Sequence, residues 1–282
     1  MLVLVAGLVL RSSGSVTIQA VGDVMLGRYV GNRIEREGTP SVFRGVQSLI
    51  GKSDLVLGNL ECCLTSAPFI KQKRFLLRAE PGSAYALKCF GFTQLSLANN
   101  HSGDAGESGV RDTKLALSKA DVASLGPSID PLIVEKNGLK IGMLSFCDLP
   151  NIVDRQKRLL VAITELRRKC DVEVVMVHWG VELSKIATSE QRRFAQQMVN
   201  SGADLIIGSH PHVLQPVEWL ANSAGKKCLV AFSLGNFVFD APKGDQQISE
   251  CLSVSAKASG VVGFKTQAVR IVGGFPIMSR PR

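Results

Sequence analysis

The chain has 282 residues, a hydrophobic fraction of 45%, a charged fraction of 20% and a formal net charge of +9 at pH 7. This length and composition exclude a largely disordered chain and allow one large α/β domain with a substantial core. The positive charge favours an acidic partner, but an aromatic fraction of 6% and the lack of Cys/His finger spacing argue against nucleic acid. Seven cysteines, an odd number without regular spacing, do not indicate a disulfide framework.

The first ten residues, MLVLVAGLVL, are almost wholly apolar. They are fewer than the roughly 20 residues that span a membrane, and they lack the basic start and the cleavage site of a signal peptide. We interpret residues 1–14 as an apolar N-terminal segment, either the remnant of a membrane anchor or a buried first segment. Residues 15–282 are expected to form a single domain, because no repeat or low-complexity linker divides them.

Strands and helices are expected to alternate along most of the chain. We expect strands at residues 16–21, 54–57, 92–98, 172–177 and 205–207, and helices at residues 41–50, 81–90, 107–119, 154–169 and 190–200. Residues 132–135 and 139–146 flank Asn137-Gly138, which predicts a hairpin because that turn needs two positive φ angles. After Pro216 the helical spacing stops, and strands are expected at residues 228–232, 251–256 and 261–272. The alternation predicts a largely parallel sheet, and the β-rich tail predicts a second sheet packed on the first.

Short polar motifs follow several of the apolar runs. They contain all four histidines of the chain and two carboxylates: Asp23 in TIQAVGD, Glu61 in DLVLGNLE, His101 in LANNHSGD, His178 in VVMVHWG, and His210 and His212 in LIIGSHPHV. In parallel sheets the ligand site lies beyond the carboxyl ends of the strands, so these side chains are expected to converge.

Carboxylate oxygens of Asp23 and Glu61, the amide oxygen of Asn100 and three imidazoles form a ligand set that suits divalent metal ions. Taken singly, each residue has a simpler explanation: a histidine at a strand end is most often a satisfied polar group, and Asp104 could cap the following helix. Taken jointly, with no histidine left elsewhere, they favour a metal centre. Cys62 and Cys63, next to Glu61, are a weaker alternative as ligands.

The motif series GDVMLGR, DLVLGNLE, LSLANNHSGDAG, VMVHWG, IIGSHPHVLQPVE and FSLGNFVFD resembles the bacterial capsule-synthesis family typified by CapA and PgsA, the poly-γ-glutamate synthesis proteins. The resemblance runs from about Val16 to the C-terminus. That family is more distantly similar to the calcineurin-like metallophosphoesterases. The resemblance therefore implies a four-layer α/β/β/α sandwich with a centre for one or two divalent ions, which would be Mn, Zn or Fe.

The resemblance also implies roles for individual residues. The implied metal ligands are Asp23, Glu61 as the bridging carboxylate, Asn100, His178, His210 and His212; His101 is the implied general acid, Asp23 is also counted as catalytic, and Arg28, Arg78 and Asn99 are implied in substrate binding. One position departs from the phosphoesterase pattern, since Met25 stands where those enzymes carry a ligand histidine. A thioether is a poor ligand for such metals, so one ion would have only Asp23, Glu61 and His212.

Two functions remain open at this point. The first is a metal-dependent hydrolase in capsule polymer synthesis that acts on a phosphoester or a γ-glutamyl amide. The second is a non-catalytic component of a polymer synthesis and export complex, which binds a polyanion and partners membrane-bound synthesis subunits. Either function predicts an anionic polymer or phosphoester as partner. Both predict a location that is membrane-associated or at the extracellular face of the cell envelope.

Overall fold

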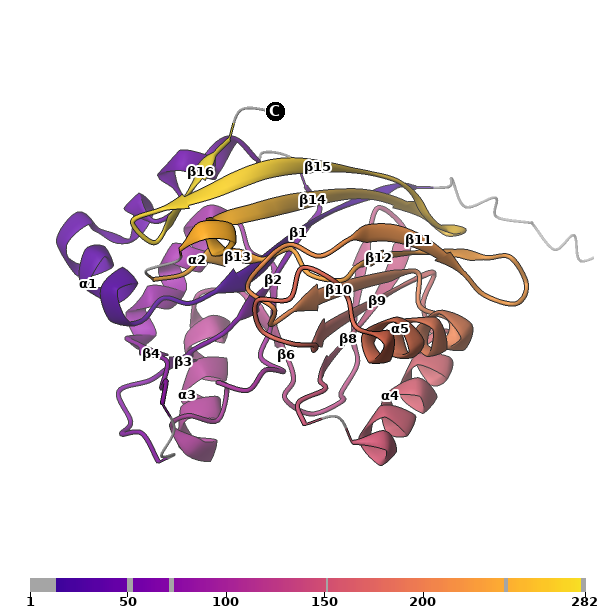
Figure 1. Ribbon diagram of the computed structural model, residues 1–282, viewed down its shortest axis with the longest axis horizontal. Coiled ribbons are helices and arrows are strands. Elements are labelled where there is room, and N and C mark those ends of the chain that lie inside the picture. The colour runs from indigo at the N-terminus through magenta and orange to yellow at the C-terminus, as the bar shows by residue number, and fades with distance from the viewer. Residues whose placement is uncertain (1–13, 50–52, 71–73, 151, 241–242, 280–282) are drawn as a thin grey trace, which may run out of the picture.

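The computed structural model describes residues 14–49, 53–70, 74–150, 152–240 and 243–279. The predicted apolar segment 1–14 lies outside these residues, except for Gly14. Two β-sheets pack face to face, and helices cover the outer face of each (Figure 1). The expected four-layer α/β/β/α sandwich is confirmed.

The first sheet has the strand order β16-β15-β14-β1-β2-β5-β6, and β13 also pairs with β1. Its strands are β1 (Val16–Val24), β2 (Leu55–Leu60), β5 (Gln94–Ser96), β6 (Ala123–Leu125), β13 (Asn236–Val238), β14 (Ile248–Lys257), β15 (Gly260–Val272) and β16 (Phe275–Met278). Strands β1, β2, β5 and β6 run parallel, whereas β14, β15 and β16 are antiparallel to their neighbours.

The second sheet has the strand order β11-β12-β10-β9-β8-β7. Its strands are β7 (Leu132–Lys136), β8 (Leu139–Cys147), β9 (Val172–His178), β10 (Leu205–Ser209), β11 (Val217–Ala221) and β12 (Lys227–Ala231). The predicted hairpin between β7 and β8 is confirmed, because Asn137 and Gly138 both have positive φ angles, of 51° and 77°.

The sequence-based division of the two sheets is wrong. The late strands β12, β14 and β15 were expected to build the second sheet. Strand β12 does so, but β14 and β15 extend the first sheet, in which β14 pairs antiparallel with β1. The second sheet comes from the middle of the chain. The apolar pattern of a strand identifies the strand but not its partner, and β1 and β14 are separated by more than 220 residues.

Helices α1 (Arg28–Glu37), α2 (Ala84–Phe90) and α3 (Gly106–Lys119) cover the first sheet, and α4 (Val153–Leu166) and α5 (Ser189–Ser201) cover the second. The remaining elements are the short strands β3 (Cys63–Leu64) and β4 (Arg78–Ala79) and 3-10 segments at Thr39–Ser41, Arg44–Leu49, Pro81–Ser83 and Gly244–Gln247. Sequence analysis did not identify α1. The helix expected at residues 41–50 is mainly 3-10 helix in its described part.

Alternation along the strands separates the three apolar layers. In β9, Val174 and Met176 face the core between the two sheets, whereas Val175 and Val177 face α4 and α5. The core between the sheets also contains Ile18 of β1, so the opposed sheets are held together mainly by burial of aliphatic side chains.

Glu173 is a buried carboxylate at the start of β9, on the face toward α4 and α5. Within the described residues, neither of its carboxylate oxygens has a hydrogen-bond partner. The neighbouring Asp204 is also buried, and it accepts hydrogen bonds from the Glu173 backbone N–H at 3.0 Å and from Arg167 at 2.6 Å, and pairs with Lys226. Burial, together with the charge of Asp204, raises the pKa of Glu173 to about 8.

Among the described residues, no helix combines the length and the apolar character needed to cross a bilayer.

Candidate metal centre

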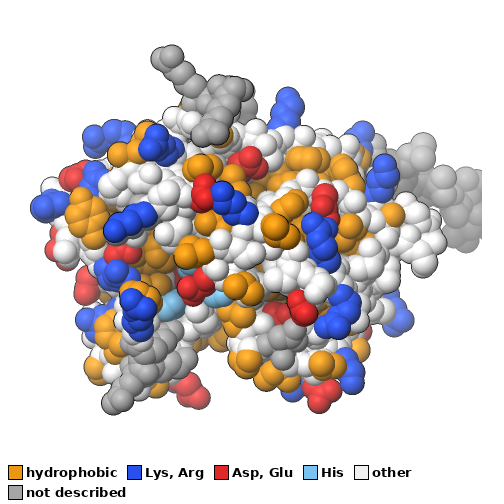
Figure 2. Space-filling view, viewed as in Figure 1, with side chains coloured by type: hydrophobic (Ala, Val, Ile, Leu, Met, Phe, Trp, Pro, Cys, Tyr) orange, Lys and Arg blue, Asp and Glu red, His pale blue; other side chains and the backbone are white. Residues whose placement is uncertain are grey.

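The carboxyl ends of strands from both sheets bring the sequence-predicted ligands together. Asp23 lies near the end of β1, Glu61 directly follows β2, and His178 is the last residue of β9. Asn100 and His101 follow β5, and His210 and His212 follow β10. All of these residues except Asn100 are buried, and Figure 2 shows small areas of histidine surface in a hollow of the molecule.

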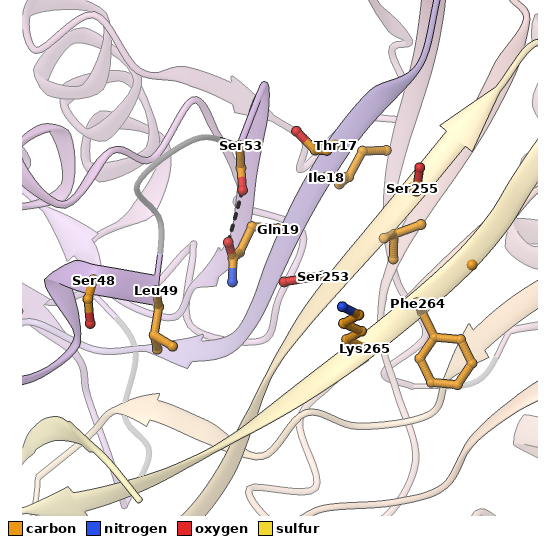
Figure 3. A pocket seen from close by; sticks show the side chains of 12 residues that line it. Thr17, Ile18, Gln19, Ser48, Leu49, Ser53, Ser253, Ser255, Phe264 and Lys265 are labelled. Carbon is orange, nitrogen blue, oxygen red and sulfur yellow. Dashed lines mark hydrogen bonds between the residues drawn. The ribbon is translucent and has the colours of Figure 1, made fainter.

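A cavity of about 740 Å³ lies elsewhere, on the outer face of the first sheet (Figure 3). Its lining is rich in hydroxyl groups, such as those of Thr17, Ser253 and Ser255, and a hydrogen bond of 2.9 Å joins Ser53 to Gln19 there. None of the residues that line it belongs to the group of predicted ligands. The candidate site is therefore identified by its chemistry and not by the volume of the cavity.

Glu61 lies at the centre of the group. Its Oε1 atom is 3.8 Å from His212 Nε2, 3.9 Å from His178 Nε2 and 4.0 Å from His101 Nε2. These separations exceed hydrogen-bond length, and within the described residues both Glu61 oxygens are without a hydrogen-bond partner. Two ligands that each lie about 2.0–2.2 Å from one ion are separated by at most about 4 Å, so the arrangement fits a bound cation.

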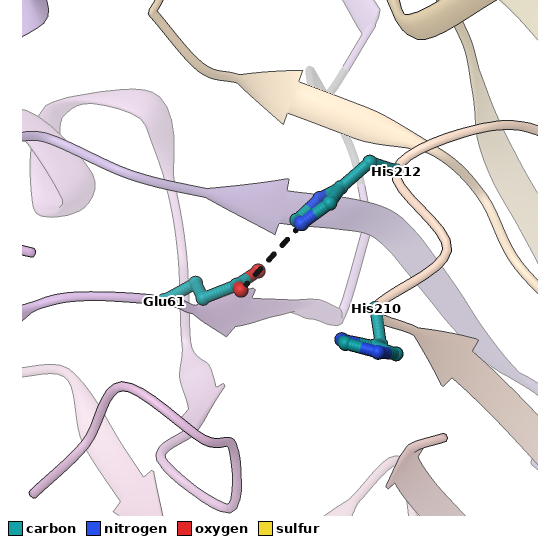
Figure 4. Close-up of side chains that lie close together, drawn as sticks. All are labelled: Glu61, His210 and His212. Carbon is teal, nitrogen blue, oxygen red and sulfur yellow. Dashed lines mark ion pairs between the residues drawn. The ribbon is translucent and has the colours of Figure 1, made fainter. Parts of the chain in front are cut away.

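His210 and His212 reach the group from a single loop. Both have positive φ angles, 98° and 59°, in the left-handed region that non-glycine residues rarely adopt. The two rings are 6.0 Å apart and both lie on the side of Glu61 (Figure 4). The strained backbone places two imidazoles side by side at the site, as often occurs at functional loops.

Two triplets of side chains have ligand atoms that all lie within 4.8 Å of one another. One consists of Glu61, His210 and His212, and the other of Asp23, Glu61 and His178. Both contain Glu61, and both combine imidazole nitrogen with carboxylate oxygen, which is the donor set of zinc, manganese and iron sites. The predicted ligands therefore form candidate metal sites in the fold.

Burial and mutual charge set the protonation of this group. Burial raises the pKa of Glu61 well above its ordinary value, with a further contribution from the Asp23 charge. Burial lowers the pKa of His178, and burial together with His212 lowers the pKa of His210 to about 4. Burial opposes the charged form of His212, but Glu61 and Asp23 raise its pKa to about 10. Burial alone would raise the pKa of Asp23, but the hydrogen bond and charge of His212 lower it. His178 and His210 are thus neutral at pH 7, the state in which imidazole binds metals.

His101 lies at the edge of the group and is held by Asp104. Its Nδ1 atom is 2.8 Å from Asp104 Oδ2, and the same oxygen accepts the Leu77 backbone N–H at 2.8 Å. The simpler explanation for Asp104, a cap on the following helix, does not apply, since α3 begins without a side-chain cap. With Nδ1 beside Asp104, Nε2 is the ring nitrogen on the side of Glu61, 4.0 Å from its Oε1 atom. This is the orientation that a proton donor to the site requires.

Asn59 and Asn99 form the scaffold beneath the site. Asn99 Nδ2 donates to Asn59 Oδ1 at 3.0 Å and to the Leu60 carbonyl at 2.8 Å, and its Oδ1 accepts the His101 backbone N–H. Asn59 Nδ2 donates in turn to Asp23 Oδ1 at 2.8 Å. These contacts give Asn99 a positioning role, while its expected role in substrate binding stays a prediction. Asn59 was not selected from the sequence, and Asp104 was considered there only as a helix cap.

Arg28 and Arg78, expected to bind substrate, lie beside the segment between β3 and β4. Arg28 pairs with Asp240 at 2.9 Å, and Arg78 donates to the Ala67 carbonyl at 2.7 Å and lies over the Phe69 ring. Within the described part of the chain, neither arginine hydrogen-bonds to a predicted ligand. Their role in substrate binding stays a prediction.

The alternative ligands next to Glu61 face away from it. Cys62 belongs to the apolar layer under α1, α2 and α3, and the Cys63 thiol donates to the carbonyls of His101 and Ser102. Met25 is packed in the same apolar layer as Cys62, and its sulfur accepts the Gly27 N–H at 3.1 Å. The thioether therefore contributes no ligand beside Asp23.

A family model described as "Bacterial capsule synthesis protein PGA_cap" matches residues 17–241. The PGA biosynthesis protein CapA of Bacillus subtilis (strain 168) is 33% identical over 272 residues, which cover 89% of this chain and 70% of that protein. The capsule biosynthesis protein CapA of Bacillus anthracis is 33% identical over 258 residues, which cover 82% of this chain and 61% of that protein. In fold, the chain is similar to a hypothetical protein from Thermus thermophilus, with a TM-score of 0.58, 16% identity, and coverage of 89% of this chain and 98% of that one.

Proposed function

Because the chain belongs to the bacterial capsule synthesis protein family PGA_cap, we propose that it acts in capsule polymer synthesis through a metal-dependent hydrolase site. The observation that carries this proposal is the environment of Glu61. This carboxylate is buried, neither of its oxygens has a hydrogen-bond partner among the described residues, and imidazole nitrogens surround it at 3.8–4.0 Å. An isolated buried carboxylate is costly, and a bound cation offsets that cost.

The residues of the site divide into ligands and a proton donor. A divalent cation in this group would lower the pKa of a bound water and polarise the scissile phosphoester or amide. His101 Nε2 lies 4.0 Å from Glu61 Oε1, at the edge of the site, and we assign to it the proton that the leaving group receives. Asp104 holds the His101 ring so that Nε2 faces the site, which keeps the donor oriented before substrate arrives.

Metal dependence is the first test of this proposal. We expect the purified chain, supplied with Mn²⁺ or Zn²⁺, to hydrolyse either a generic phosphoester such as p-nitrophenyl phosphate or poly-γ-glutamate. Chelation with EDTA should remove the activity and added metal should restore it, because a bound ion would activate both the water and the substrate. Product release is measured before chelation, after chelation and after metal is returned. Activity indifferent to EDTA would contradict a metal-dependent site.

A second candidate function is the binding of a polyanion without catalysis, and the formal charge of +9 favours it. In this account Arg78 contacts the polymer. The Arg78→Gln variant should then bind poly-γ-glutamate several-fold more weakly, and binding should weaken as salt is raised but survive metal removal. The control is Arg111→Gln, which removes an exposed arginine of α3. Binding measured by calorimetry that does not change between low and high salt would count against this function.

For either function, we propose a location at the cell envelope, with membrane-bound polymer synthesis subunits as partners. The support is the description of the relatives as capsule and PGA biosynthesis proteins.

A further inference from the structure

We propose that the edge of the molecule opposite the candidate metal centre binds an anionic membrane surface. This basic edge consists of the segments at the amino ends of the parallel strands, and its exposed basic side chains are Lys136, Lys140, Arg168, Lys169, Lys227 and Lys257. The inference rests on the proposed location at the cell envelope, and it names the surface that binds and its ligand, the headgroups of anionic phospholipids. It does not depend on the chemistry of the metal centre.

The direction of the strands separates the basic edge from the metal centre. Strand β1 begins at Val16 and ends one residue beyond Asp23, and β9 begins at Val172 and ends at His178. Strands rise about 3.3 Å per residue, so the basic edge lies roughly 20–30 Å from the predicted ligands. A membrane bound at this edge would therefore leave the metal centre open to a polymer in solution.

Contacts between neighbouring turns join these segments into one surface. The Asn137 side chain, in the turn between β7 and β8, donates to the Ser15 carbonyl at 3.0 Å, just before β1 begins. The Asp171 backbone N–H donates to the Lys140 carbonyl at 2.8 Å, which joins the start of β8 to the start of β9. In Figure 1 the start of β1, the β11–β12 turn and the β14–β15 turn all lie at the right of the molecule.

The carboxylates of this edge offset little of its positive charge. Asp204 is buried and pairs with both Arg167 and Lys226. Because the pKa of Glu173 is raised to about 8 by burial and by the charge of Asp204, this side chain is neutral at pH 7. Among the described residues of the edge, the exposed basic side chains outnumber the remaining carboxylates, which are Glu135, Asp54 and Asp171.

Apolar side chains accompany the basic ones. Since β1 begins at Val16, the apolar residues 1–10 join the fold at this same edge. The exposed side chains of Trp219 and Phe264, whose rings are 5.9 Å apart, and of Val262 lie near it. Aromatic and basic side chains beside an apolar segment are typical of the membrane–water interface. This combination favours a lipid surface over a soluble anionic polymer, which would use the charges alone.

Vesicle binding by the full chain tests the inference. Vesicles of phosphatidylglycerol and phosphatidylcholine in equal parts are compared with vesicles of phosphatidylcholine alone, and bound protein is measured by flotation. We expect binding to the anionic vesicles, weakening steeply as salt is raised. Equal binding to both kinds of vesicle, or no binding to the anionic kind, would overturn the inference. The proposed hydrolase would still stand, because its activity is measured on soluble substrates, and so would the location, because partner subunits could hold the chain there.

Two matched variants assign the binding to the basic edge. The edge variant carries Lys140→Gln, Arg168→Gln, Lys169→Gln and Lys257→Gln. It should bind anionic vesicles weaker by about 100-fold or more, because each basic residue near such a surface contributes to binding. The control variant loses the same charge from exposed positions on α1, α3 and α4, through Arg36→Gln, Arg111→Gln, Lys114→Gln and Arg158→Gln. It should bind within about twofold of the native chain. An equal loss in both variants would overturn the inference, since net charge alone would then explain the binding.

An anionic polymer is the competing occupant of the basic edge. Poly-γ-glutamate is titrated by calorimetry into the native chain and into both variants, after circular dichroism has shown that the variants are folded. We expect the edge variant to bind the polymer as the control variant does. Loss of polymer binding in the edge variant, together with a native chain that does not bind anionic vesicles, would overturn the inference and assign the edge to the polymer.

Discussion

Replacing His101 with alanine is expected to lower kcat about 100- to 10,000-fold on whichever phosphoester or γ-glutamyl substrate gives turnover. The Nε2 atom lies 4.0 Å from Glu61 at the edge of the site, and Nδ1 lies 2.8 Å from Asp104 Oδ2. The proposed function therefore assigns to His101 the protonation of the leaving group. Bound metal should not change, because His101 is not needed to hold the ion. The measurement is kcat and metal content on the same preparation.

Asp104→Asn provides the matched variant for His101. It keeps the ring in place through an amide of the same shape but replaces the carboxylate beside His101 Nδ1 with a neutral group. We expect a smaller loss in kcat than for His101→Ala, with KM little changed, since the aspartate does not contact substrate. Unchanged turnover in His101→Ala would remove His101 as the acid and transfer that role to another group.

Replacing Glu173 with glutamine is expected to stabilise the fold by roughly 4 kcal/mol at pH 8 and above, and by about 1 kcal/mol or less at pH 5. The folded-state pKa of Glu173 is about 8, above the ordinary glutamate value of 4.5. Between these two pKa values, the Glu173 carboxyl is ionised in the unfolded chain but protonated in the folded chain. The native protein therefore loses stability as pH rises through this window. Below pH 4.5 both states are protonated and the penalty is absent.

Glutamine cannot ionise, so the Glu173→Gln variant should show a flatter dependence of unfolding free energy on pH. Denaturant unfolding at pH 5, 7 and 9 measures this difference. Glu165→Gln, which changes an exposed glutamate of α4, serves as the control and should follow the native curve. A gain in stability that is equal at all three pH values would show that the carboxyl is not held neutral by burial beside Asp204.

The layered fold and most of its elements could be predicted because each depends on local pattern. The run of apolar residues in β9, the hairpin at Asn137-Gly138 and the helical spacing in α5 all carry their own signal. Pairing does not. The short strands β6 and β13 and the edge strands β11 and β16 were missed, because their pairing to neighbours, and not their composition, defines them.

The ligand side chains could be predicted because histidine and carboxylate residues that follow apolar strands indicate metal ligands by residue type alone. The hydrogen-bond partners of these side chains could not be predicted. Asn59 lies inside an apolar strand and Asn236 begins a three-residue strand, so neither differs from an ordinary polar residue until the fold brings it beside Asp23 or His212. The positive φ angles of His210 and His212 are equally invisible, since nothing in the motif requires a left-handed backbone.

The pairing of β1 with β14 has a consequence for how the chain is made. Strands β14 and β15 follow His212 in the sequence. The ribosome therefore synthesises every residue of the candidate metal centre, from Asp23 to His212, before it reaches these strands. Until then β1 presents an open edge that invites pairing with other nascent chains. Co-translational assembly of the site is therefore incomplete until synthesis is nearly finished, and premature termination after His212 would release a chain with all its ligands and no stable frame to hold them.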